Sequence, residues 1–315
     1  MEQTTKSMPV ILDTDPGCDD AVAIMLAAKQ ACLDLKALTV VAGNATLQKA
    51  ARNALDVCSY LGFDQLTIAA GMVRPLVREQ VVADEIHGVN GLANLEFGEP
   101  IMKLSFKHAV NLIIEVLLSS EEEITFVALG PLTNLAMAMR LEPRIIPKIK
   151  RIVLIGGSYG FGNVTPAAEF NIYADPEAAH IVFTCGRPIV MIGLSITERV
   201  LVTKEVMEKI GSVNNKAGLL FSNLMTFYNR THRRLFHKEV SPLYDPAAIA
   251  YLINPSIFTT RPMYVEIELK SAQSYGRTHC DYYGTLNKSA NAEVVTDLDS
   301  DGFWSIIYET IKLYG

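Results

Sequence analysis

Four short apolar runs of this chain end in small or polar residues, at residues 9–12, 38–41, 124–129 and 152–155. Helix-like segments separate them, and alternating strand and helix signals are typical of a mostly parallel sheet flanked by helices. In an open, doubly wound α/β fold of this kind the ligand lies at the carboxyl ends of the strands. We therefore predict a single α/β domain over residues 1–315 with its functional site at that edge.

Composition narrows the classes of function. The 315 residues are 50% hydrophobic, which is enough to bury a large core. The net charge is −6 and the basic residues are scattered, so the sequence shows no basic patch typical of a nucleic-acid-binding surface. No apolar run reaches the roughly 18 residues of a membrane span, and residues 1–7 lack a signal-peptide core. The five cysteines form no CxxC pair, which excludes an obvious zinc site or disulfide framework. We predict a cytoplasmic protein without membrane or nucleic-acid partners.

The first apolar run leads directly into the sequence DTDPGCDD, which places Asp13, Asp15, Asp19 and Asp20 within eight residues. Four like charges on one turn raise one another's pKa unless a cation or hydrogen bonds compensate them. Hard carboxylate oxygens suit Ca²⁺ or Mg²⁺ better than zinc. The alternative is that Asp19 and Asp20 only cap the helix that follows, but capping requires one acid and not four.

Polar groups also follow later apolar runs. Asn44 comes after the second run, where it can serve the site or cap the next helix, and the two interpretations stay open. The irregular stretch of residues 72–100 is long for a compact domain, and we expect it to form a lid in which His87 titrates near neutrality. A surface histidine in a glycine-rich turn is the alternative for His87. Gly156 and Gly157 do not form a GxGxxG fingerprint, so a dinucleotide site is not indicated.

The segment of residues 162–171 carries Asn163, Glu169 and Asn171, whose amides and carboxylate can hydrogen-bond a polyhydroxylated ligand. By spacing alone this signal is weak. Asp175 and Asp245 each precede a proline at the start of an apolar helix, a pattern typical of a helix cap. An amphipathic helix is predicted at residues 219–228, ahead of a basic, histidine-bearing segment at 230–238.

Together the motifs resemble the nucleoside hydrolases of the inosine-uridine preferring type. The resemblance covers essentially the whole chain. It is carried by DTDPGCDD at 13–20, AGN at 42–44, HGVNGL at 87–92, GPLTNLAMA at 130–138, IGG at 155–157, GNVTPAAEFNIYADPEAA at 162–179 and PLYDPAAIAYLINP at 242–255. It implies a cytoplasmic, calcium-dependent glycosidase of nucleoside salvage that acts on small-molecule ribonucleosides and assembles as a homodimer or homotetramer.

The resemblance also implies roles for individual residues. The calcium ligands would be the side chains of Asp15, Asp20 and Asp245 and the backbone carbonyl of Leu129. Asp13 and Asn44 would support these ligands, and Asp19 would bind a ribose hydroxyl. The remaining substrate-binding residues would be Asn163, Glu169 and Asn171 at the ribose and Ile155, Phe170 and His87 along the sugar and base pocket.

The chemistry of these groups agrees with that implication. A bound Ca²⁺ lowers the pKa of a water molecule, and Asp15 is placed to accept its proton. The water would then attack C1′ of the ribose while the N-glycosidic bond breaks through an oxocarbenium-like state that carboxylates stabilise. No covalent intermediate is needed.

Two residues depart from the usual pattern of the family. Tyr244 stands where well-studied members carry a histidine that is the proposed acid for a purine leaving group, and Cys18 replaces an aliphatic residue. Both features resemble a less characterised branch, which leaves base preference and the leaving-group acid open. Tyr244 titrates near pH 10 in model peptides and is a poor donor, so it can simply pack in the pocket wall. Tyr228, His232 or His237 are the other candidates for the acid.

Two alternatives to the hydrolase belong to other classes of protein. The first, motivated by Tyr244, is a ribonucleoside-binding protein that has lost efficient catalysis. The second is a phosphoryl transferase, because an Asp-x-Asp sequence after an apolar strand also occurs in aspartyl-phosphate enzymes. The continuation Pro16-Gly17-Cys18-Asp19-Asp20 does not match that second motif.

Overall fold

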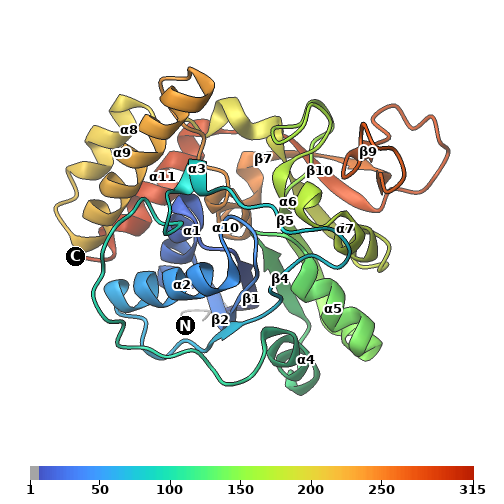
Figure 1. Ribbon diagram of the computed structural model, residues 1–315, viewed down its shortest axis with the longest axis horizontal. Helices are drawn as coiled ribbons and strands as arrows, with labels where there is room; N and C mark the ends of the chain where they lie inside the picture. Colours follow the sequence, from blue (N-terminus) through green and yellow to red (C-terminus); the bar gives the residue numbers. More distant parts are fainter. Residues whose placement is uncertain (1–6) are drawn as a thin grey trace, which may run out of the picture.

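The computed structural model describes residues 7–315, and its centre is an eight-stranded sheet with the order β3-β2-β1-β4-β5-β6-β10-β7 (Figure 1). The strands are β1 (Met8–Thr14), β2 (Leu33–Val40), β3 (Ile68–Ala70), β4 (Ile124–Ala128), β5 (Ile149–Ile155), β6 (Ile189–Ile192), β7 (Phe258–Met263) and β10 (Ala292–Leu298). All neighbours pair in parallel except β10 and β7, which are antiparallel. The predicted mostly parallel α/β sheet is therefore confirmed. Residues 1–6, part of the segment from which we predicted no signal peptide, lie outside the described residues.

Helices cover both faces of the sheet. They are α1 (Cys18–Lys29), α2 (Leu47–Leu61), α3 (Asp84–His87), α4 (Ala109–Ser119), α5 (Thr133–Leu141), α6 (Phe170–Ala174), α7 (Pro176–Phe183), α8 (Lys204–Gly211), α9 (Lys216–Phe236), α10 (Pro246–Ile253) and α11 (Ser300–Lys312). Short 3-10 helices span Pro143–Lys148, Leu194–Arg199 and Pro255–Ile257.

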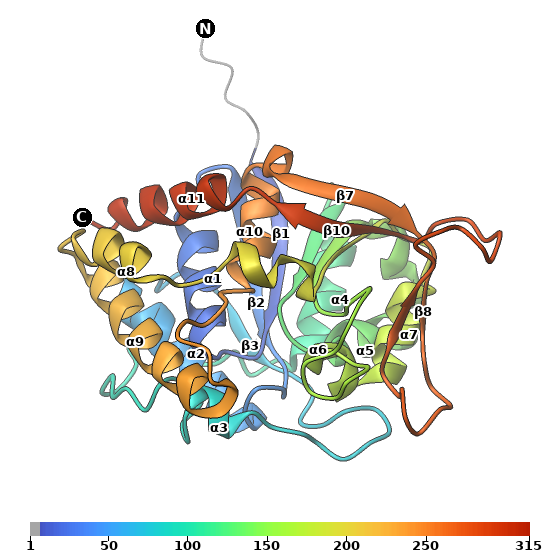
Figure 2. The ribbon, with the colours of Figure 1, turned by 90° about the horizontal axis from the view of Figure 1, so that it is seen from above.

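Alternate residues of each strand enter two separate cores. Val10 and Leu12 of β1 pack with α1, α2, α9, α10 and α11, whereas Ile11 packs with α4, α5 and α7. The second group of helices lies to the right of the sheet in Figure 1, and Figure 2 shows α11 running beside α8. Because both faces are covered, the strands are continuously apolar, which is why short unbroken runs marked them in the sequence.

The order of connection reverses between β1 and β4, two neighbouring strands in the interior of the sheet. Ligands of doubly wound sheets bind outside the carboxyl ends of the strands at such a switch point. Asp15 and Leu129 follow β1 and β4 directly, so the topology places the predicted site residues at this position.

Two elements are longer than predicted. β1 continues past Leu12 through Thr14 because Asp13 and Thr14 still pair with β2, and Thr39 Oγ1 donates a 2.5 Å hydrogen bond to the Asp13 carboxylate. α9 runs from residue 216 to 236 rather than 219 to 228. Its second half buries Tyr228 and His232 on the helix face that buries Leu224, so the basic segment continues the helix.

Residues 72–100, which we call the lid segment, are irregular as predicted, apart from α3. Met72 N donates to Asn134 Oδ1 (2.8 Å), Leu76 N to Asp175 Oδ2 (3.0 Å) and Ala83 N to the Asn44 carbonyl (2.8 Å).

A small antiparallel pair, β8 (Val265–Ile267) and β9 (Thr278–Cys280), projects beyond the sheet within residues 264–291, which we call the arm (Figure 2). Within residues 7–315 no helix combines the length and apolar character of a membrane span.

Candidate active site

The acidic turn after β1 lies in the interior of the molecule and is held by hydrogen bonds from backbone and side-chain groups. Asp20 Oδ1 accepts a 2.5 Å bond from Thr14 Oγ1, and its Oδ2 accepts from Gly17 N at 2.8 Å. The Asn44 side chain donates to the same Oδ2 at 3.1 Å. These bonds fix the Asp20 carboxylate at the beginning of α1, where the helix dipole also favours a negative charge.

Asp15 lies beside this turn in a space that only glycine neighbours allow. Asn44 N donates a 2.6 Å bond to Asp15 Oδ2, while Asp15 Oδ1 is buried without a hydrogen-bond partner among the described residues. A Cβ atom on Gly43 or Gly130 would come within 2.0 Å or 2.3 Å of the two carboxylate oxygens. An ionised oxygen that is buried and unpartnered is costly, and a cation is the usual compensation.

Asp245 comes from a distant part of the sequence, at the start of α10. Carboxylate oxygens of Asp19, Asp20 and Asp245 lie within 4.8 Å of one another, a spacing that can hold a metal ion. Burial raises the pKa of Asp19 to about 7, helped by the charge of Asp20, and burial with the neighbouring acids raises the pKa of Asp15 and of Asp245 well above the ordinary range. The all-oxygen donor set and the mutual repulsion both fit a hard divalent cation.

Asp13 lies beneath these acids and has its own partners. Its Oδ1 accepts hydrogen bonds from Thr39 Oγ1 at 2.5 Å and from Asn134 Nδ2 at 2.8 Å. Complete burial raises the pKa of Asp13 to about 7 in spite of these bonds. Asp13 thus ties β1 to β2 and α5 below the acidic turn.

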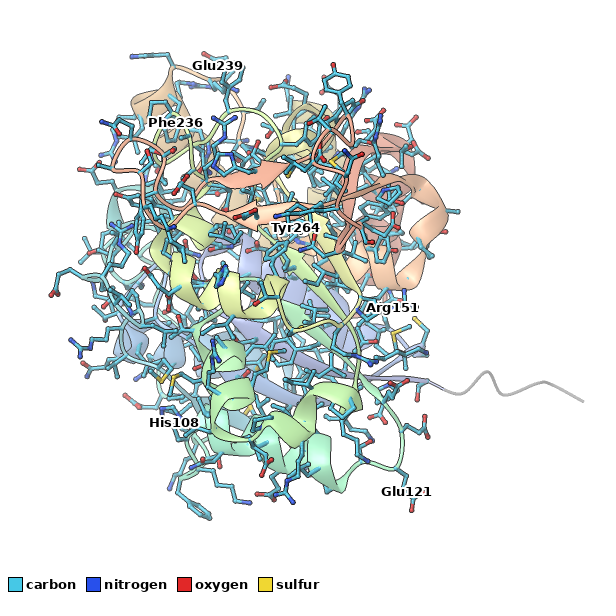
Figure 3. The ribbon with its side chains drawn as sticks, turned by 90° about the vertical axis from the view of Figure 1, so that its right-hand side faces the viewer. His108, Glu121, Arg151, Phe236, Glu239 and Tyr264 are labelled. Carbon is cyan, nitrogen blue, oxygen red and sulfur yellow. The ribbon has the colours of Figure 1, made fainter. Side chains whose placement is uncertain are left out.

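A cavity of about 450 Å³ opens above the carboxylates, a volume suited to a small ligand. Its walls include Asp19, Asn44, Leu129 and Asp245 at the acidic turn. Phe236 of α9 also lines the cavity, and Figure 3 shows it well apart from Arg151 near the beginning of β5. The cavity therefore lies at the carboxyl ends of the strands, as the topology requires.

The ribose-binding residues predicted at 163–171 lie on one wall of this cavity, around the beginning of α6. Glu169 accepts from Gly157 N at 2.8 Å and from Asn171 N at 3.0 Å, and burial raises its pKa. Asn171 Nδ2 donates to the Leu129 carbonyl at 2.6 Å and to the Ile155 carbonyl at 3.0 Å. Because Asn171 links the ends of β4 and β5, this wall is rigid.

Aromatic side chains form the opposite wall. The His87 ring stacks on Tyr228 with 5.5 Å between centroids, and Tyr228 contacts His232 edge to face at 4.6 Å. His87 Nδ1 accepts a 3.2 Å bond from Cys18 N, so the lid segment contacts the acidic turn. Burial lowers the pKa of His87 to about 4 and also lowers the pKa of His232, so both rings are neutral at pH 7.

Tyr244 lies at the edge of the cavity, and its hydroxyl is 2.9 Å from Thr197 Oγ1. Burial raises the pKa of Tyr244 well above 10. His237, the third candidate acid, is exposed at the end of α9, whereas Tyr228 and His232 line the cavity. The structure therefore separates His237 from the other candidates.

Of the residues predicted for the site, most share this cavity. The predicted residues in its wall are Asp19, Asn44, His87, Leu129, Ile155, Asn163, Glu169, Phe170, Asn171, Tyr228, His232, Tyr244 and Asp245. Asp15 and Asp20 lie next to that wall at the acidic turn. Sequence reasoning missed Thr197, Phe236 and Lys238. Thr197 follows β6, where the strand-end rule could have found it, but no pattern marked the other two.

The fold and the site together define an α/β enzyme in which buried carboxylates, able to hold a cation, lie below a pocket for a small hydroxylated substrate. Residues 10–305 match the family model described as inosine-uridine preferring nucleoside hydrolase. The chain belongs to this family, whose reaction is hydrolysis of the N-glycosidic bond of ribonucleosides.

Individual relatives agree with this assignment. The chain is 47% identical over 305 residues to the pyrimidine-specific ribonucleoside hydrolase RihB of Escherichia coli (strain K12), covering 97% of each chain. Among solved structures it resembles the plant nucleoside hydrolase PpNRh1, with 34% identity, a TM-score of 0.89 and coverage of 98% and 99% of the two chains. It also resembles a purine-preferring ribonucleoside hydrolase from Gardnerella vaginalis, with 30% identity, a TM-score of 0.89 and coverage of 96% and 99%.

Proposed function

We propose that this enzyme is a calcium-dependent hydrolase with a preference for pyrimidine ribonucleosides. The observation that carries the calcium proposal is the convergence of buried acids from distant parts of the chain, with Asp15 Oδ1 unpartnered beside them. The base preference rests on the similarity to the pyrimidine-specific RihB. Membership of the family favours hydrolysis over the binding protein and the phosphoryl transferase considered from the sequence.

The proposed calcium ligands are Asp15, Asp20, Asp245 and the Leu129 carbonyl. A bound calcium ion would supply a Lewis acid that orients the ribose hydroxyls and makes a water molecule more acidic. Asn44 holds two of these acids in place, through its backbone N–H to Asp15 and its amide to Asp20. Asp19 faces the cavity and would accept a hydrogen bond from a ribose hydroxyl.

The chain's own groups account for the next steps. Asp15 would accept the proton of the attacking water, since its Oδ1 has no hydrogen-bond partner among the described residues. Asn163, Glu169 and Asn171 would hold the remaining ribose hydroxyls, with Ile155 and Phe170 against the sugar. The negative charges of the acidic turn would stabilise the positive charge that develops on the ribose.

The leaving base would lie against the wall formed by His87, Tyr228 and His232. We propose His232 as the proton donor, because it lines the cavity beside Tyr228. Its lowered pKa leaves only a minor imidazolium fraction near neutrality, and that fraction would give up its proton readily. Burial raises the pKa of Tyr228 and of Tyr244, so both hydroxyls hold their protons too strongly for this role. Tyr244 would then shape the pocket through its bond to Thr197.

The test is ribose release from uridine, cytidine, inosine and adenosine and from the 2′-deoxy analogues, with calcium and with a chelator. We expect calcium-dependent release that is fastest with uridine and cytidine and is lost with the deoxy analogues. Faster release from the purine nucleosides would refute the base preference. Full activity in the chelator, in protein with no bound metal by elemental analysis, would refute the calcium proposal.

Three further proposals rest on the sequence. We propose one domain over residues 1–315, which the sharing of a single sheet by both cores supports. A homodimer or homotetramer and a cytoplasmic location remain predictions. Sedimentation of the purified enzyme and fractionation of cells that express it would test them.

A further inference from the structure

Asn53 is a buried polar residue on the core-facing side of α2, among Ala50, Ala54 and Val57. Its side chain is 3% exposed, although burying an amide among apolar neighbours costs free energy unless its hydrogen bonds are made. It lies outside the motifs that carry the family resemblance, and it does not line the cavity. Its partners indicate why an amide is needed at this position.

The Asn53 amide joins two segments that lie far apart in the sequence. Nδ2 donates one hydrogen bond to the Pro16 carbonyl and one to the Asn90 carbonyl, each at 3.0 Å. Pro16 belongs to the acidic turn, between Asp15 and Asp19, and Asn90 belongs to the lid segment just after His87. Both hydrogens of the amide nitrogen are therefore used to hold the lid segment against the acidic turn.

The backbone of the lid segment passes directly over this amide. A Cβ atom on Gly91 would come within 2.9 Å of Asn53 Nδ2 and 3.1 Å of Ala45 Cβ. Gly91 also has a φ of +80°, a conformation that favours glycine. The close approach and the left-handed backbone together require glycine here, so Gly91 and Asn53 fit one another as a pair.

The two sides of this contact depend on it differently. The acids of the turn have other partners, since Thr14, Gly17 and Asn44 bind Asp20 and Asp15. The turn of the lid segment is held mostly by bonds within itself, such as those from Leu92 N and Asn94 N to Asn90 Oδ1. Loss of the Asn53 amide would therefore loosen residues 88–95 of the lid segment and leave the acidic turn in place.

We propose that Asn53 is a positioning residue, which fastens residues 88–95 to the acidic turn and thereby holds His87 at the base side of the pocket. The inference rests on the proposed function, because the effect on catalysis supposes that His87 contacts the base. Asn53 does not touch the substrate. Its effect passes through the Asn90 carbonyl to the lid segment, and from there to the His87 ring against Cys18 N and Tyr228.

Asn53→Asp and Asn53→Ser test the proposal, with Asn291→Ser as the matched control. Asn53→Asp keeps the shape but sets a carboxylate against two carbonyls, and the milder Asn53→Ser applies if Asn53→Asp does not fold. Asn291 is also an asparagine whose Nδ2 donates to two carbonyls, those of Phe183 (3.0 Å) and Val265 (2.9 Å), but it lies in the arm. Gly91→Ala strains the same contact from the lid side.

We expect kcat/KM for uridine to fall about tenfold or more in the Asn53 variants and Gly91→Ala, since a displacement of about 1 Å can cost 10²-fold. The affinity for calcium should change less than about tenfold, because a loss of about tenfold or more is expected only when a group that orients the metal ligands is removed. Amide hydrogen exchange over residues 84–95 should become faster, while exchange in α1 and β4 stays slow. Asn291→Ser should change neither catalysis nor exchange in residues 84–95.

Two results would overturn the proposal. One is a fall in kcat/KM no larger than that of Asn291→Ser, and the other is unchanged exchange over residues 84–95 in folded Asn53 variants. If the unmodified enzyme releases ribose from no nucleoside, the proposed function fails. The role of Asn53 in holding the lid segment is then judged by amide hydrogen exchange alone. Faster exchange confined to residues 84–95 supports this role, and unchanged exchange refutes it.

Discussion

The acidic turn at the base of the pocket and the aromatic wall are built in different ways. The acids of the turn after β1 lie within eight residues of one another and are held by hydrogen bonds from backbone and short side chains. The aromatic wall joins the lid segment to α9 through ring contacts of 5.5 Å and 4.6 Å and through a bond from Arg234 Nη2 to the Glu85 carbonyl at 3.1 Å. The acidic turn is local in sequence and held in a fixed position, whereas the aromatic wall is assembled from distant segments.

Under the proposed mechanism this difference separates two tasks of the enzyme. Groups that act on the ribose and the water need fixed positions, which strand ends and buried backbone bonds provide. Groups that contact the base can belong to a loop and a helix that move apart to admit a substrate. Changes in the acidic turn should therefore affect all substrates equally, whereas changes in the aromatic wall should depend on the base.

The largest effect is expected for Asp15→Asn, which keeps the shape but removes the proposed general base. We predict a fall in kcat of about a thousandfold for every nucleoside, within the range for a lost general base. Initial rates of ribose release at saturating calcium would measure it. Asp297→Asn, an exposed carboxylate paired with Arg199 at 2.7 Å, is the control and should retain full activity. A loss with Asp15→Asn that varies with the base would break the comparison.

Chelation should make stability depend on pH through the buried acids. Burial raises the pKa of Asp13 and of Asp19 from 3.8 to about 7, so the folded chain binds more protons than the unfolded chain between these values. The chelated protein should therefore lose stability as the pH rises from about 4 to 7, on the order of 4 kcal/mol for each carboxyl, since each pKa is shifted by about three units and one unit is worth about 1.4 kcal/mol.

With calcium bound, the positive charge replaces these protons, and the melting temperature should not fall over the same pH range. Thermal unfolding followed at several pH values, with and without a chelator, would check both curves. Parallel curves would mean that the acidic turn does not hold the cation.

A smaller effect is expected for His232→Gln on the aromatic wall. We predict a fall in kcat of about a hundredfold with uridine, typical for a lost general acid. A riboside with a 4-nitrophenol leaving group needs no protonation to depart, so its hydrolysis should change little. Comparing uridine with this riboside would test whether the aromatic wall acts on the leaving base alone. Equal losses of kcat with both substrates would exclude His232 as the proton donor.

The smallest effect is expected for Tyr244→Phe, which removes the hydroxyl that lies 2.9 Å from Thr197 Oγ1. Because the raised pKa of Tyr244 prevents proton donation near neutrality, only a pocket contact should be lost. We predict a change in kcat/KM of about threefold for uridine and inosine, in keeping with the net worth of about 1 kcal/mol for one hydrogen bond. A hundredfold loss would instead make Tyr244 the acid.

The sequence predicted the acidic turn and the strand ends beside it well, for a physical reason. Buried parallel strands need continuous apolar runs, and the strand ends place Asp15, Asn44 and Leu129 at one edge without knowledge of long-range contacts. The early end predicted for β1 was wrong because Asp13 looks like a turn residue until its pairing with Thr39 is seen.

The aromatic wall was less predictable. α9 was ended eight residues too early, at Tyr228, because the basic residues that follow hide the burial of Thr231 and His232. α8, β9 and the part played by Phe236 were missed because they depend on tertiary packing. Local sequence patterns do not record which helix a loop will meet, so His87 and Tyr228 became neighbours only in the folded chain.

Tyr314 ties α1 to a part of the chain that is far away in the sequence. Its hydroxyl donates a 2.7 Å bond to the Met25 carbonyl in α1, and the two residues are 289 positions apart. Because a chain is synthesised from its N-terminus, α1 leaves the ribosome well before this partner is made. A chain terminated between the two would lack this bond and the packing of α11 on α1, which would make α1 a target for chaperones and proteases.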